Sequence, residues 1–188
     1  MPPEASTATA LLSALRSVNR AVAIAVGLFL AGCAAFVLLD VVLRQVGASF
    51  GGTDEISGYV MAIATSWGMG YALMELGHVR IDLIRSRGRT MTRSLFDLFA
   101  LATLAGTVSL IAWQAWPVVA RSLANSSRAN TQLETPLALV QVPWFAGWVW
   151  FAVVSWLTLV AAAMLVLRGD HAAADRAIGA MGEGEARE

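Results

Sequence analysis

Residues 144–167 read WFAGWVWFAVVSWLTLVAAAMLVL, which is 24 positions without one charged side chain. A helix needs about 20 apolar residues to cross a hydrocarbon core of roughly 30 Å. Lipid offers the backbone no hydrogen-bond partners, so a stretch of this kind must be a helix that satisfies its own polar groups. The sequence therefore predicts a membrane-spanning helix here.

Three further segments, 21–43, 56–76 and 98–118, are also long and apolar enough to span a bilayer. The composition agrees, because 57% of the residues are hydrophobic and 14% are charged, against roughly 25% charged in a soluble domain. A chain with so little charge cannot cover a water-facing surface. We therefore expect an all-α membrane protein with a four-helix membrane domain over 21–167.

The placement of arginine predicts the orientation. Ten of the 13 basic residues lie before the first span, between the second and third spans, or after the last, and only Arg44, Arg121 and Arg128 lie on the opposite side. The positive-inside rule assigns the arginine-rich side to the cytoplasm. We therefore expect a cytoplasmic N-terminal segment over 1–20 and a cytoplasmic tail over 168–188.

Segments outside the spans carry weaker patterns. Residues 6–20 place four apolar side chains on one helical face, Leu11, Leu12, Leu15 and Val18. This spacing predicts an N-terminal amphipathic helix lying on the membrane. The arginine-rich link after the second span fits an interfacial segment in the same way. The tail from Gly169 is rich in Ala, Gly and charge, so we expect it to be solvated and poorly ordered.

The single cysteine, Cys33, allows two interpretations. Leu30-Ala31-Gly32-Cys33 fits the pattern at which bacterial lipoproteins are cleaved and lipidated. However, the apolar run continues over 34–39, whereas the apolar region of a signal peptide normally ends at the cleavage site. We therefore favour Cys33 as a small apolar residue within an uncleaved span.

Two of the predicted spans carry small residues at every fourth position. The second span has Gly58, Ala62, Ser66 and Gly70, and the first has Ala23, Gly27, Ala31 and Ala35. Such stripes let helix backbones approach closely inside a bilayer. They fit a docking face for another membrane protein and packing within this chain's own bundle equally well.

The acidic residues near the membrane are Asp40, Asp54, Glu55, Glu75 and Asp97. An acid at the bilayer midplane is expensive and signals ion or substrate coupling. All five fall near span ends instead, and Asp40 can pair with Arg44 one helical turn later. We therefore interpret them as interfacial anchors and members of local pairs.

Several function classes find no support in the residues. The formal net charge is zero, which indicates no nucleic-acid partner. Neither histidine lies within a predicted span, so a haem between helices lacks its usual ligands. The sequence has no nucleophile–base pair, cysteine-based metal site or phosphate-binding loop. We expect no enzyme activity, metal or cofactor. Pro117 and Pro143 are expected at helix ends.

Five short motifs, taken together in order and spacing, resemble a known family. They are DVVLR at 40–44, TDEI at 53–56, GMG at 68–70, GHVRID at 77–82, and the TPL and VPW flanks of 135–144. They look like the small membrane subunit of tripartite ATP-independent periplasmic (TRAP) transporters, the DctQ-like family. The resemblance covers about 21–167. It points to an interfacial motif of charged residues and one histidine: Asp40, Arg44, Glu55, Glu75, His78, Arg80 and Asp82.

This resemblance implies a helper role in the bacterial inner membrane. In the family, a large membrane subunit carries the substrate and sodium sites, and a periplasmic binding protein delivers the substrate, typically an organic acid. The small subunit packs against the large one and widens its scaffold. Two alternatives stay open at this point. They are a membrane anchor of another complex, which would be expected to hold histidines in its spans, and a small stand-alone exporter, which would want a midplane acid.

Overall fold

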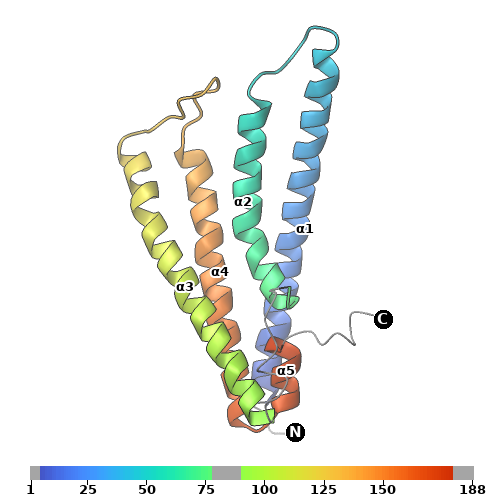
Figure 1. Cartoon of the computed structure of the whole chain (residues 1–188), viewed down its shortest axis with the longest axis vertical. Coiled ribbons are helices and arrows are strands. Elements are labelled where there is room, and N and C mark those ends of the chain that lie inside the picture. Colours follow the sequence, from blue (N-terminus) through green and yellow to red (C-terminus); the bar gives the residue numbers. More distant parts are fainter. Residues whose placement is uncertain (1–4, 78–89, 180–188) are drawn as a thin grey trace. The chain divides into compact units, whose positions relative to one another are not determined.

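The computed structural model describes residues 5–77 and 90–179, and every named element in these ranges is a helix. This confirms the all-α class. An isolated bridge between Arg128 and Pro136 is the extended pairing found there. The helices, shown in Figure 1, are α1 (Ala5–Arg44), α2 (Thr53–Met74), α3 (Thr90–Ala124), α4 (Ala138–Leu167) and α5 (His171–Ile178).

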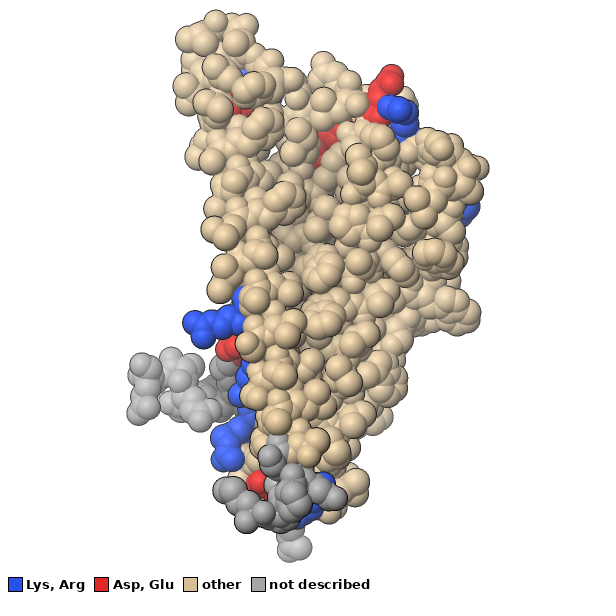
Figure 2. Space-filling model, turned by 180° about the vertical axis from the view of Figure 1, so that it is seen from behind, with Lys and Arg blue, Asp and Glu red and all other residues tan. Residues whose placement is uncertain are grey.

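Within the described ranges, three helical segments are long and apolar enough to cross a membrane: Thr7–Arg44, Thr90–Ala124 and Ala138–Leu167. The remaining predicted span, 56–76, corresponds to α2, whose Gly, Ser, Thr, Trp and Tyr residues lower its mean hydropathy. Uncharged side chains make up most of the face of the molecule seen in Figure 2.

The N-terminal segment differs from the expected separate amphipathic helix. Residues 5–20 form the first part of α1 and continue without a break to Arg44. Leu12 and Leu15 are buried within the protein, whereas Val18 is 46% exposed. A separate surface helix is therefore not confirmed, because the leucines expected to face lipid are covered by the chain itself. The expected interfacial segment after α2 lies outside the described residues.

The described residues fall into two compact units. The first is drawn from Met1–Arg20, Gly70–Val108 and Ala152–Glu188, and the second from Ala21–Met69 and Ser109–Phe151. In the first unit, α5 lies beside the start of α1 (Figure 1), and the Arg16 guanidinium donates to the Arg176 carbonyl at 3.3 Å. Ser94 on α3 also hydrogen-bonds the His171 ring at 3.1 Å.

The expectation of a poorly ordered tail is wrong for 171–178. After α4, Gly169 takes a left-handed φ of 78°, the conformation in which glycine commonly ends a helix. The Asp170 side chain then accepts from the Ala173 N–H and caps α5. Ala174, Ala177 and Ile178 are buried. Their spacing places them on one face, and that short apolar stripe holds the helix against the first unit.

In the second unit, α2 packs closely on α4. Trp67 Nε1 donates to the Pro143 carbonyl at 2.9 Å. A Cβ added at Gly147 would collide with the Ser66 side chain and would lie 2.9 Å from Trp67 Cδ1. Pro143 lies inside α4 and Pro117 inside α3. Their expected place at helix ends is wrong because both helices extend beyond the apolar runs.

The close approach at Gly147 gives a stability prediction. Gly147→Ala should lower the free energy of unfolding by about 1–3 kcal/mol, the usual cost of overpacking a core. Gly106→Ala on α3 is the matched control, since a Cβ there meets nothing within 4 Å, and helix propensity should make it neutral or stabilising by about 0.5–1 kcal/mol. Thermal unfolding in mild detergent measures both. Equal melting temperatures for the two variants would contradict this packing.

Candidate functional site

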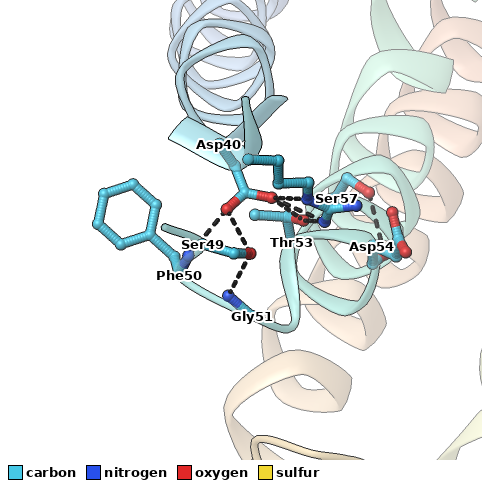
Figure 3. Close-up of polar contacts among 8 residues, drawn as sticks. Asp40, Ser49, Phe50, Gly51, Thr53, Asp54 and Ser57 are labelled. Atoms are coloured by element: carbon cyan, nitrogen blue, oxygen red, sulfur yellow. Dashed lines mark hydrogen bonds and ion pairs between the residues drawn. The ribbon is translucent and has the colours of Figure 1, made fainter. Parts of the chain in front are cut away.

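The Asp40 carboxylate is the centre of a polar network in the second unit (Figure 3). Asp40 is fully buried and lies one turn before the end of α1. Its Oδ1 accepts from Ser49 Oγ at 2.9 Å and from the Phe50 N–H at 2.8 Å. Its Oδ2 accepts from Arg44 Nε at 2.8 Å and from Thr53 Oγ1 at 3.0 Å.

Asp40 therefore joins three successive pieces of chain. Arg44 closes α1, Ser49 and Phe50 belong to the connecting loop, and Thr53 opens α2. Arg44 Nη2 also donates to Thr53 Oγ1 at 3.1 Å, so the two ends of the loop are linked to each other as well as to the carboxylate. The Asp40–Arg44 ion pair expected from the one-turn spacing is present, at 2.7 Å.

Two consecutive glycines let the loop make this turn. Gly51 and Gly52 have φ values of 70° and 67°, in the left-handed region where a side chain is strained. At Gly52 a Cβ would also lie 2.5 Å from Leu133 Cγ, on the loop between α3 and α4. The left-handed backbone therefore favours glycine there, and any side chain would also displace that of Leu133.

A second carboxylate ties α2 to that same α3–α4 loop. Glu55 lies in the first turn of α2, before the apolar stretch, and its Oε1 accepts from Tyr59 Oη at 2.6 Å. Hydrogen bonds from Thr131 and from Tyr59 lower the pKa of Glu55, although its burial acts in the opposite direction. These contacts favour the ionised carboxylate, although its Oε2 is buried without a hydrogen-bond partner among the described residues.

The Asp40 network leads to a second prediction. Asp40→Asn removes the charge and turns one acceptor oxygen into a donor, so at least one N–H donor, that of Phe50 or of Arg44, loses its partner. Because Arg44 is half-exposed, we expect a loss of about 1–3 kcal/mol in unfolding free energy. The control is Asp54→Asn, an exposed acid in the first turn of α2, worth about 0.3–1 kcal/mol through the helix dipole. Thermal unfolding measures both variants. Equal melting temperatures for Asp40→Asn and Asp54→Asn would argue against the Asp40 network as a stabilising element.

The two small-residue stripes are used differently. On α2, Ser66 and Gly70 are buried, Ala62 is half-buried and only Gly58 is exposed. Ser66 packs on this chain's own Gly147. On α1 the stripe residues following Ala23 are all exposed, and these are Gly27, Ala31 and Ala35.

Of the remaining interfacial residues, the structure describes Glu75, which is not brought into the network. It follows the end of α2 and is exposed. Three members of the expected motif, His78, Arg80 and Asp82, lie outside the described residues. The structure also adds residues that the sequence interpretation did not single out, namely Ser49, Thr53 and Tyr59. The available signals were the hydroxyl groups of Ser49 and Thr53 around the start of a helix that opens with acids, and the four-residue spacing of Glu55 and Tyr59.

These features define the class: a helical membrane protein in which polar side chains tie helix ends together. The family model for the DctQ component of tripartite ATP-independent periplasmic transporters matches residues 33–155. The match covers more than half of the chain, so the chain belongs to this family. Neither the curated proteins nor the solved structures contain a match.

Family membership defines the general role. The chain is a transmembrane component of a transporter, and its family is not one of enzymes. The family works within TRAP transporters together with a large membrane subunit and a periplasmic binding protein. Together with the apolar helices, this places the protein in the bacterial inner membrane.

Proposed function

We propose that this chain is the small permease subunit that scaffolds a large TRAP membrane subunit during sodium-driven, binding-protein-dependent uptake of an organic acid. The observation that carries the proposal is the bare apolar surface of α1. In the most apolar stretch of α1, which is long enough to span the membrane, none of the residues is buried inside the described chain. Leu28 is 69% exposed and Leu38 is 65% exposed.

Small residues on α1 allow a helix of another subunit, and not only lipid, to pack against that surface. A Cβ added at Gly27 would meet nothing within 4 Å, so the chain itself gives no reason for a glycine there. Backbones that approach closely gain van der Waals contact, which drives association when lipid is as apolar as leucine. We therefore assign the α1 stripe to the large subunit, and we assign the Ser66 part of the α2 stripe to packing within the chain.

The proposed topology has four spans, with a membrane domain over 21–167 and both termini in the cytoplasm. Although α2 is less hydrophobic, its 22 residues reach about 33 Å at about 1.5 Å per residue, enough for the hydrocarbon core. An even number of spans also returns the tail to the side of the N-terminal segment, as the ten-to-three arginine bias requires.

The described acids support a scaffold rather than a coupling role. Asp40 spends both oxygens on its own loop and helix ends. The Asp40 carboxylate therefore has no free oxygen to offer a cation. Glu55 uses its Oε1 on Tyr59, and its Oε2 is buried without a hydrogen-bond partner among the described residues. We therefore assign the sodium and substrate sites to the large subunit.

Docking of the large subunit on α1 is tested by replacing small residues of the α1 stripe with leucine. Gly27→Leu combined with Ala31→Leu should push a docked helix away and reduce recovery of the large subunit at least severalfold, while insertion is unchanged. Ala25→Leu, an exposed position on the opposite face of α1, is the matched control. The measurement is co-purification from native membranes in mild detergent. A chain that transports alone at full rate, without a partner, would support the stand-alone exporter instead.

The topology makes a separate prediction. Reporter fusions at Arg89 and at Arg187 should score cytoplasmic, and a fusion at Ser127 should score periplasmic, because the positive-inside rule governs short loops. Paired reporters that are active on opposite sides of the membrane measure this. A periplasmic score at Arg89 would exclude the four-span arrangement.

A further inference from the structure

The first unit carries an open cavity that the scaffold role does not use. Its volume is about 320 Å³, and it lies among the start of α1, the end of α4 and α5. Two cationic side chains line it, Arg16 from α1 and Arg176 from α5. The same cavity is bordered by the Ser13 hydroxyl and by the apolar side chains of Leu12 and Leu165.

The charge of this cavity is one-sided. None of the described residues that line it is acidic. Two carboxylates lie on or beside α5, but Asp170 caps the helix and Asp175 borders a separate pocket with Arg93 and His171. Arg16 uses one N–H on the Arg176 carbonyl, and a guanidinium carries five such donors in a fork that matches phosphate.

Away from the two arginines, the cavity is lined in part by the apolar side chains of Leu12 and Leu165. Leu12 is 7% exposed and Leu165 is 1% exposed, so each adds a small apolar surface to the lining of the cavity. An inorganic anion needs only the donors. A ligand that fits donors and apolar wall together has an anionic head and a hydrocarbon part.

The position along the helices matches the level of lipid headgroups. Arg16 precedes the start of the apolar run at Ala21 by five residues, about 7.5 Å along the helix. Leu165 lies two residues before the apolar run of α4 ends at Leu167. Long arginine side chains at such positions reach the interface, and basic pockets between membrane helices bind anionic phospholipid headgroups.

We propose that this cavity binds one anionic phospholipid, with Arg16 and Arg176 holding its phosphate and Leu12 and Leu165 contacting the start of its acyl chains. The bound lipid bridges α1 to α5, which are distant in sequence. The proposal needs membrane insertion only, so it stands or falls separately from docking of the large subunit.

Native mass spectrometry of the full, delipidated chain tests this, with phosphatidylglycerol or phosphatidylcholine added back. We expect one phosphatidylglycerol retained per chain in preference to phosphatidylcholine. Arg16→Gln with Arg176→Gln should weaken that binding about thirtyfold, taking each arginine at its usual contribution to anionic-lipid binding. Ser13→Trp, at an exposed position, fills the cavity without changing charge and should abolish retention. Circular dichroism confirms that each variant is folded.

Two controls separate this site from other sources of affinity. Arg20→Gln removes an exposed arginine one turn from Arg16 that does not line the cavity, and it should retain the lipid. A large excess of inorganic phosphate should not displace it. The proposal is overturned if the double arginine variant or Ser13→Trp binds as the native chain does. It is also overturned if Arg20→Gln loses as much affinity, or if free phosphate competes.

Discussion

The hydrogen bonds of the Asp40 carboxylate are the interaction on which the arrangement of α1 and α2 depends. Helices satisfy their own backbone inside lipid, but the turns between them cannot, and they need side chains to complete their bonding. Asp40 does this for the first turn, accepting from a loop hydroxyl, a loop N–H and the first residue of α2. Glu55 extends the same device to the loop between α3 and α4.

Small residues serve two purposes in this chain, and the structure separates them. Gly147 on α4 lets α2 approach until Ser66 and Trp67 fill the space that a side chain would need. Gly27 on α1 faces nothing in the chain. A helix that leaves its apolar face bare is suited to a partner that supplies the other half of the packing, and this agrees with a family that works beside a large membrane subunit.

Apolar runs were enough to predict the all-α class and the approximate position of each long helix, because a run of about 20 apolar residues has one stable solution in lipid. The Asp40–Arg44 pair also followed from sequence, since residues one turn apart meet on a helix. The bonds from Ser49 and Thr53 did not, because they depend on a loop whose path is set by the left-handed Gly51 and Gly52. The short helix α5 was missed as well, since its three buried residues stand among small and charged ones.

We propose that this chain supports transport without coupling it to sodium. The initial uptake rate against external sodium, in vesicles holding the assembled complex and its binding protein, tests this proposal. Glu75→Gln and Asp40→Asn are the variants to compare with the native chain. We expect an unchanged dependence on sodium, with at most a lower plateau where Asp40→Asn weakens assembly. Loss of sodium dependence in either variant, with the complex intact, would show instead that acids of this chain couple ions.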